Sequence, residues 1–213
     1  MNYRILGRTG LKVSEIGLGG EWFNGLSQAE STAIVDAAEE NGINYIDIFM
    51  PQAPIAAIEV IFNMFRLKPA EELFPAAKAK GIGILARVPL ASGLLTGRYT
   101  KDTVFGKEDH RNYNRNGEAF DKGETFSGVD YELGLQAAEE LKKLFHTENL
   151  IPYALRWILM HDAVSAVIPG ASKQEQVLSN VRAARMPSLT QEQMDGVSAI
   201  YDRYIKESVH ENW

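Results

Sequence analysis

The sequence of 213 residues contains no cysteine. Disulfide bonds, thiol nucleophiles and thiolate metal sites are therefore excluded. It also lacks an excess of basic residues, since 22 Lys and Arg stand against 28 Asp and Glu, for a formal net charge of −6. We expect neither nucleic acid nor an anionic membrane surface as a partner, because proteins usually meet both with a basic patch.

Long apolar segments are absent as well. No window approaches the roughly 18 consecutive apolar residues of a transmembrane helix. The first residues, MNYRILGRTGLKVSEIG, show no apolar run typical of a signal peptide. We therefore expect a cytoplasmic protein that does not enter the membrane. With 45% hydrophobic residues, the chain has enough apolar material for one domain over residues 1–213.

Strand and helix patterns alternate along the chain. Residues 3–13 predict a β-hairpin around a Gly-Arg-Thr-Gly turn. Strands are predicted at 15–19, 43–48, 57–62, 82–86 and 164–168, and helices at about 27–41, 69–80, 131–145, 152–161, 175–184 and 190–208. Ser27 with Glu30, and Thr190 with Gln193, have the spacing of helix capping boxes. The alternation favours an α/β fold with a parallel sheet or barrel.

Residues 97–128 interrupt this rhythm. They are polar and rich in Gly, Asn and Asp, and they show no lasting period, which predicts a long surface loop. Aromatic residues in and near this loop either line an apolar pocket or pin the loop to the protein; they are Trp22, Phe23, Phe105, Tyr113 and Phe126.

The stretch AVSAVIPGASKQEQVLSN, residues 163–180, turns abruptly from strand to helix. Ser172 and Glu175 have capping-box spacing, which would fix the start of the helix. A helix start offers free backbone N–H groups and the positive end of the dipole, so it favours anions. Gly170 and Ala171 would let a ligand approach closely.

Three further polar residues follow this turn. Lys173 adds a positive charge, while Gln176 and Asn180 lie four apart on one helix face and can hydrogen-bond a flat polar group. Two interpretations stay open from spacing alone. The segment is either a phosphate and adenine site or a well-capped connection with exposed polar residues.

Four segments resemble the aldo-keto reductase family. They are the IPGA-x-x-x-x-Q-x-x-x-N pattern of residues 168–180, the stretch LGRTGLKVSEIGLG at 6–19, the stretch RVPLASGLLTGRY at 87–99 and the stretch YALRWIL at 153–159. Their order agrees with that of the family, and the resemblance covers most of 1–47 and almost all of 58–204. The sequence is identified as a member on this basis.

The resemblance implies a fold derived from the (β/α)8 TIM barrel. The strands that correspond are the first, second, sixth, seventh and eighth, so three β/α units are missing, with a junction near residues 50–57. We expect an incomplete barrel of about five β/α units with an N-terminal β-hairpin. Unless its second and sixth strands pair, the sheet has open edges, and open edges invite association into homo-oligomers.

The resemblance also implies NADP(H) as cofactor and a small carbonyl compound as substrate, reduced to an alcohol. The adenosine 2′-phosphate and adenine would be held by Ser172, Lys173, Gln176 and Asn180, beside Gly170 and Ala171. The pyrophosphate would be covered by Leu90, Ser92, Gly93 and Leu95. The nicotinamide would be bordered by Gly20, Glu21, Trp22, Glu59 and Arg87, with Asn63 closing the strand of Glu59.

The catalytic residues of the family are mostly missing. The family uses a Tyr acid, a Lys that lowers its pKa, an Asp that pairs with the Lys, and a His that orients the carbonyl. Asp47 fits the Asp, but Gln52 stands where the Tyr is expected, and the Lys and His have no counterpart. The alternative to an active reductase is therefore a non-catalytic NADP(H)-binding module or an inactive truncated reductase.

Other titratable residues offer weak substitutes. Tyr45 shares a strand face with Asp47 because side chains alternate along a strand, and it is either a core residue or a recruited acid. His161 ends a predicted helix, where we expect a structural cation. His146 and His210 are expected to be exposed, and no His pair has the spacing of a metal site.

Overall fold

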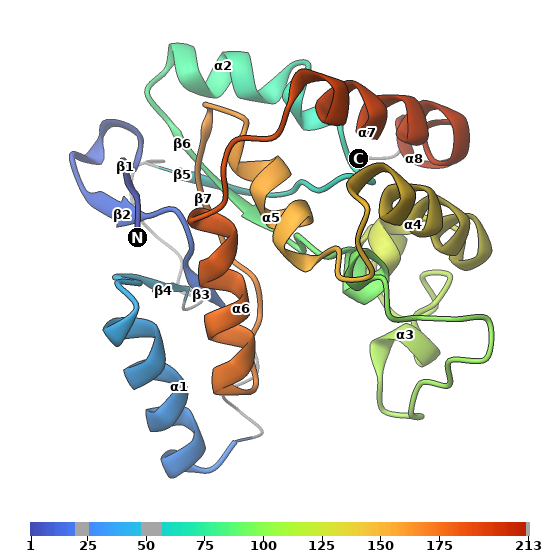
Figure 1. The fold of residues 1–213 in the computed structure, drawn as a ribbon, viewed down its shortest axis with the longest axis horizontal. Coiled ribbons are helices and arrows are strands. Elements are labelled where there is room, and N and C mark those ends of the chain that lie inside the picture. The colour runs from blue at the N-terminus through green and yellow to red at the C-terminus, as the bar shows by residue number, and fades with distance from the viewer. Residues whose placement is uncertain (20–25, 48–56, 212–213) are drawn as a thin grey trace.

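The computed structural model describes residues 1–19, 26–47 and 57–211. The N-terminal hairpin consists of β1 (Tyr3–Ile5) and β2 (Lys12–Ser14), and the other strands are β3 (Leu18–Gly19), β4 (Ile46–Asp47), β5 (Ala57–Ile61), β6 (Gly83–Arg87) and β7 (Val164–Val167) (Figure 1). The helices are α1 (Gln28–Glu40), α2 (Leu73–Ala79), α3 (His110–Tyr113), α4 (Tyr131–Phe145), α5 (Ile151–Leu159), α6 (Gln174–Ala184), α7 (Gln191–Tyr204) and α8 (Lys206–Val209). Short 3-10 turns are η1 (Gly7–Thr9), η3 (Lys68–Ala70), η4 (Ala91–Thr96), η5 (Lys122–Glu124) and η6 (Phe126–Gly128).

The five strands after the hairpin run parallel. β6 pairs with β5 on one side and with β7 on the other, and β3 pairs with β4. Bridges from Ile16 to Val167 and from Gly19 to Gly170 join the two groups. The Gly17 N–H lies 2.9 Å from the Val167 carbonyl oxygen, and the Val167 N–H lies 3.0 Å from that of Glu15. The strand order is therefore β4-β3-β7-β6-β5.

This order is an arc of a barrel. In a closed (β/α)8 barrel the first strand lies between the second and the last, and here β3 lies between β4 and β7. The expected fold, an incomplete barrel of about five β/α units with an N-terminal hairpin, is confirmed. The missing units fall between β4 and β5, and residues 48–56 are too few even for one crossover, which takes a dozen or more residues.

The two ends of the arc are sheet edges. Among the described residues, β4 and β5 form no ladder with each other. β5 is only partly covered, with an exposed Glu59 among half-buried neighbours, whereas all four residues of β7 are buried. Of the two arrangements expected from the sequence, direct pairing of β4 with β5 is not found within the described residues.

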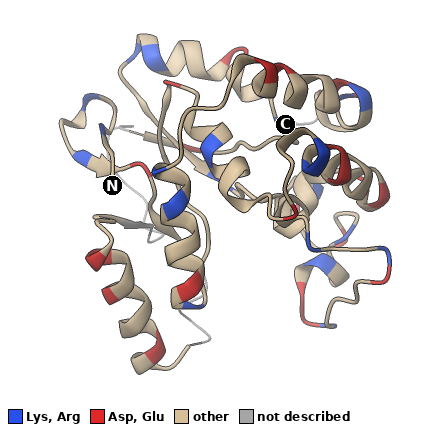
Figure 2. Cartoon of the chain, in the orientation of Figure 1, with Lys and Arg blue, Asp and Glu red and all other residues tan. Residues whose placement is uncertain are grey.

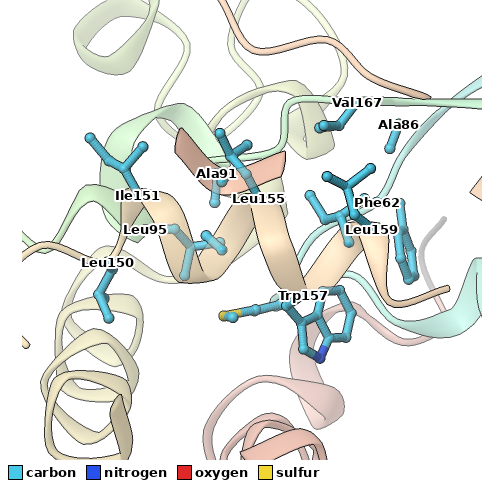
Figure 3. Packing of buried hydrophobic residues seen from close by; sticks show 14 of the residues in the cluster. Phe62, Ala86, Ala91, Leu95, Leu150, Ile151, Leu155, Trp157, Leu159 and Val167 are labelled. Carbon is cyan, nitrogen blue, oxygen red and sulfur yellow. The ribbon is translucent and has the colours of Figure 1, made fainter. Parts of the chain in front are cut away.

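Helix α5 lies at the centre of the core (Figure 3). Leu155, Trp157 and Ile158 are almost fully buried on it, and Trp157 stacks on Phe62 of the β5 end with ring centroids 5.1 Å apart. Truncation of a buried aromatic side chain of this size typically costs about 3–5 kcal/mol. No helix in the described part of the chain combines the length and the apolar character needed to cross a bilayer.

Two of the predicted capping boxes are present. The Ser27 hydroxyl accepts the Glu30 N–H at 3.3 Å, and the Glu30 carboxylate accepts the Ser27 N–H at 2.9 Å. Thr190 and Gln193 make the same reciprocal pair at 3.2 and 3.0 Å. Both helices therefore begin where the sequence places them, since each box satisfies backbone donors that the helix leaves unpaired.

His161 has a structural role, but the expectation that it is a cation was wrong. Its ring is mostly buried between Trp157 and Phe62, with centroids 4.7 and 4.8 Å away, and it also approaches Phe74. Burial lowers the pKa of His161 to about 4. The ring is thus neutral at pH 7, because the aromatic surroundings disfavour its charge more than the helix dipole favours it.

Of the two histidines expected to be exposed, one matches its prediction. His146 is exposed at the end of α4. The expectation that His210 is exposed was wrong, since only 11% of its side chain is accessible. Its Nδ1 lies 2.9 Å from the Tyr201 hydroxyl, and its Nε2 lies 3.4 Å from the Glu71 carboxylate. His210 is the C-cap residue of α8, so this short helix brings the ring against Tyr201 of α7.

Stability should fall in acid because of His161. Its folded pKa, about 4, lies below the ordinary 6.5, so between these values only the unfolded state takes up the proton. We expect the free energy of unfolding to decrease as the pH falls from 6.5 to 4.5, by up to about 3 kcal/mol from this group. Urea denaturation at several pH values measures it. A His161→Phe variant keeps an aromatic ring and should show a flatter pH dependence; equal slopes would contradict the assignment.

Candidate functional site

Two loops leave the sheet side by side at its carboxyl edge. Residues 88–97 follow β6, and residues 168–173 follow the adjacent β7. Ligands of α/β folds bind at this edge, where strands lead into helices. Most of the described residues that the sequence assigns to a dinucleotide site lie on these two loops and on the helix that follows the second one.

The start of α6 is capped differently from the prediction. Lys173, not Ser172, is the residue before the first helical turn. Gln176 therefore occupies the third helical position, and its side-chain oxygen accepts the N–H groups of Ser172 at 2.6 Å and Lys173 at 3.0 Å. The predicted box of Ser172 with Glu175 was wrong, because Glu175 falls one position too early to reach back to the cap.

The residues at this helix start differ in accessibility. Gly170, Ser172 and Lys173 are exposed, while Asn180 is buried with 5% of its surface accessible. Lys173 makes no ion pair with any residue in the described part of the chain. An exposed, uncompensated ammonium beside a hydroxyl fits an anion. An anion that used the backbone N–H groups as well would take the place of the Gln176 oxygen.

The loop after β6 has an unusual backbone. Val88, Ala91 and Ser92 have φ of 50°, 47° and 52°, and Gly93 has a φ of 102°. Non-glycine residues rarely adopt this left-handed region, which costs of the order of 1–3 kcal/mol for each residue. Leu95 has no accessible surface, so it lies beneath the loop surface that a ligand could reach. Surrounding contacts must hold the loop in this shape.

Arg111 and Tyr99 supply part of that support. The Arg111 guanidinium binds the Asp109 carboxylate, and its Nη1 donates to the Tyr99 hydroxyl and, at 3.4 Å, to the Ser92 carbonyl. Its hydrogen bonds lower the pKa of Asp109, whereas burial raises the pKa of Tyr99. No sequence pattern indicates this cluster, because its members are up to 19 residues apart within a segment without periodicity.

A segment of the long loop covers the end of β6. Glu124 binds Arg87 through two hydrogen bonds of 2.8 and 2.7 Å, and its carbonyl accepts the Ser92 hydroxyl at 3.2 Å. The Asn63 side chain donates to the Ser127 hydroxyl at 2.8 Å and to the Val88 carbonyl at 2.9 Å. The predicted nicotinamide and pyrophosphate residues are thus tied to residues 124–127, which the sequence did not assign to a site.

The remaining predicted residues lie at other strand ends or outside the described part. Asp47 is the last described residue of β4, at the same carboxyl edge as the two loops. Gly20, Glu21, Trp22 and Gln52 lie outside the described residues. Tyr45 is half-buried and packs against Gly17, where a Cβ would lie 2.2 Å from its ring.

The aromatic residues of the loop pin it to the protein. Phe105 and Phe126 are buried, with Phe105 5.2 Å from Tyr99 and Phe126 5.1 Å from Tyr131 between ring centroids. Tyr113 is exposed on α3. Of the two roles considered for these rings, Phe105 and Phe126 serve the packing of the loop.

The family profile described as "Aldo/keto reductase family" matches residues 50–202. The chain belongs to the aldo/keto reductase family. It is therefore related to carbonyl-reducing oxidoreductases. An aldo-keto reductase of Bacillus subtilis (YhdN) is 28% identical over 172 residues, 78% of this chain and 48% of the relative. A probable voltage-gated potassium channel subunit beta of Oryza sativa subsp. japonica is 31% identical over 149 residues, 65% of this chain and 42% of the relative.

The chain thus spans about half the length of the curated relatives it matches. Among solved structures, an aldo-keto reductase from Bacillus halodurans in its holo form superposes with a TM-score of 0.69 at 19% identity, covering 100% of this chain and 99% of that one. The glycerol dehydrogenase of Gluconobacter oxydans superposes with a TM-score of 0.57 at 26% identity, covering 84% of this chain and 56% of that one. The first likeness supports the barrel-derived fold.

Gly93 should tolerate no side chain. An added Cβ would lie 2.3 Å from the Tyr99 hydroxyl, and the φ of 102° disfavours any other residue. We expect Gly93→Ala to lower the free energy of unfolding by at least about 2 kcal/mol. Gly106→Ala, in the long loop that follows, is the control, since nothing lies within 4 Å of its Cβ position. Denaturant unfolding measures both, and equal effects would show that the turn at Gly93 is not constrained.

Proposed function

We propose that this chain binds NADP(H) at the carboxyl edge of β5, β6 and β7. The observation that carries the proposal is the placement of the residue 88–97 loop beside the exposed start of α6, on two adjacent parallel strands. A dinucleotide needs a phosphate site and a close backbone approach at neighbouring strand ends. Family membership supports the choice of ligand.

The adenosine end belongs at α6 in this proposal. Lys173 and Ser172 would hold the 2′-phosphate, since both are exposed and Lys173 has no carboxylate partner among the described residues. Gly170 and Ala171 would give the pyrophosphate room, and Asn180 would face the adenine from within the helix. Gln176 would exchange its cap hydrogen bonds for contacts with the ligand.

The other half of the dinucleotide belongs beside β6 and β5. The pyrophosphate would be covered by Leu90, Ser92 and Gly93, with the buried Leu95 supporting them from beneath. Glu59 and Arg87 would border the nicotinamide, together with Gly20, Glu21 and Trp22 from the chain beyond β3. Arg87 would do so while paired with Glu124, so that this edge of the site carries little net charge.

Reduction of a small carbonyl compound is the second candidate function. NADPH supplies the hydride for such a reduction when it is bound. Asp47 ends β4 at the same sheet edge, in the place of the family's Asp. The phenol that donates the proton, the Lys that tunes it and the His that orients the carbonyl have no counterpart in this sequence. Binding without turnover is therefore the primary proposal, and the cytoplasmic location remains a prediction.

The 2′-phosphate assignment is tested at Lys173. Lys173→Glu should weaken NADPH binding by tenfold or more and NADH binding much less, because only NADPH carries the additional phosphate. Lys80→Glu makes the same charge change on an exposed residue at the amino end of β6 and should leave both affinities unchanged. Quenching of tryptophan fluorescence during titration gives the dissociation constants. Equal losses for both dinucleotides at Lys173 would refute the assignment.

The same titration separates the two candidate functions. After saturation with NADPH, a panel of small aldehydes and ketones is added and the absorbance of the reduced nicotinamide is followed. We expect binding without oxidation. Oxidation above that of the Lys173→Glu variant would favour the second candidate and require a proton donor not identified in the chain.

The open edges lead to a prediction about association. β5 offers a row of backbone groups that no described strand pairs, and such edges bind other chains. We expect dimers or larger species at micromolar concentrations in sedimentation velocity experiments. The Phe62 N–H donates to Arg87 of β6, and N–H groups alternate in direction along a strand, so the Ile61 N–H points to the open edge. An Ile61→Pro substitution removes this edge donor and should shift the distribution towards monomer; a wild-type monomer throughout this range would contradict the prediction.

A further inference from the structure

A cavity lined by none of the proposed dinucleotide-binding residues lies between the long loop and the start of α4. Its volume is about 250 Å³, below the range of drug-sized ligand pockets and well above that of a single water molecule. It is lined by Lys101, Arg115, Asn116, Lys122, Val129, Asp130, Tyr131 and Glu132. The size suits a small polar group rather than a nucleotide.

The cavity brings three cationic side chains together in a chain of net charge −6. Figure 2 shows basic residues in blue along the loop that precedes α4. Lys101, Arg115 and Lys122 come from three separate parts of this loop. Of these, Lys101 lies 4.0 Å from the Glu132 carboxylate, while Arg115 and Lys122 form no ion pair with any residue in the described ranges.

Arg115 is fixed by contacts that leave its charge uncompensated. Its guanidinium lies over the ring of Tyr131 at 4.8 Å and approaches Phe105 and Phe126 at 5.6 and 5.8 Å. Its Nε donates to the Arg111 carbonyl at 3.2 Å. The described contacts thus place a preorganised cation with free Nη donors at the cavity, and such a group binds oxyanions in paired hydrogen bonds.

The acidic lining residues are engaged elsewhere. The Asp130 carboxylate caps α4, accepting the N–H groups of Glu132 at 2.9 Å and Leu133 at 3.1 Å. Glu132 faces Lys101. The five charged lining residues sum to one positive charge, and the two cations without a carboxylate partner dominate.

From this arrangement we propose that the cavity is a binding site for a phosphate group, either free or carried by a small metabolite. Arg115 would bind two of the phosphate oxygens. Lys122 would approach from a later part of the same loop, and Lys101 would leave Glu132 to contact the ligand. The site would be independent of the dinucleotide. Occupancy would link the residue 97–104 segment, the 115–122 segment and α4, and so would stiffen the loop that covers the end of β6.

Calorimetric titration of the full chain tests the proposal. The probes are inorganic phosphate and glycerol 3-phosphate, with sodium chloride at equal ionic strength as the blank. We expect saturable binding that Lys122→Gln weakens about tenfold, since one charge-assisted hydrogen bond is lost. Lys107→Gln is the control, because this exposed lysine of the same loop does not line the cavity. Phosphate heats no larger than those of sodium chloride would overturn the proposal. Equal weakening of phosphate binding by Lys122→Gln and Lys107→Gln would also overturn it.

Two further binding measurements test where the phosphate binds. Lys101→Gln provides a second exposed substitution and should also weaken binding, with circular dichroism checking that each variant is folded. Phosphate binding should persist in Lys173→Glu and in saturating NADPH; displacement by NADPH would place the phosphate in the dinucleotide site and overturn the proposal. Tighter binding of glycerol 3-phosphate would identify an esterified phosphate as the ligand, and equal binding would identify the phosphate group alone.

Discussion

The hydrogen bonds between residues 15–17 and Val167 hold the two halves of the sheet together. The Gly17 N–H and the Val167 N–H each have a partner across this junction, at 2.9 and 3.0 Å. Without these hydrogen bonds, β3 and β4 would form an isolated two-stranded sheet, and β5, β6 and β7 would form a separate three-stranded sheet. The junction also fixes where the end of β3 lies relative to the start of α6, because Gly19 and Gly170 form a bridge between these segments.

A second constraint is the strained backbone above β6. Left-handed residues are kept there only when surrounding contacts over-determine them. Here Arg111, Tyr99, Glu124 and Asn63 provide those contacts, and each uses a polar group that could otherwise meet a ligand. The same holds at α6, where the Gln176 oxygen occupies the first backbone donors. Apart from the exposed Lys173, the polar groups named here are thus engaged within the protein, and a ligand must replace their existing hydrogen bonds.

Local signals predicted most of the fold. The capping boxes at Ser27 and Thr190, the hairpin turn and the apolar strands depend on neighbours in sequence, so their positions follow from short patterns. The strand order came from family resemblance, which supplied what periodicity alone could not. His161 and His210 were misjudged because part of their surroundings comes from distant segments, Phe62 for the first and Glu71 for the second. The Arg87–Glu124 pair escaped prediction for the same reason, since 37 residues separate its members.

The junction of β3 with β7 also constrains how the chain acquires its structure. About 150 residues separate Ile16 from Val167, so their pairing closes a very large loop, and such non-local contacts slow folding. The segment from β3 through α1 to β4 is synthesised before β7, so it can join the rest of the sheet only after β7 has been made. We infer that this segment stays incompletely folded until then, and that the last strand, rather than the first, commits the sheet to its final order.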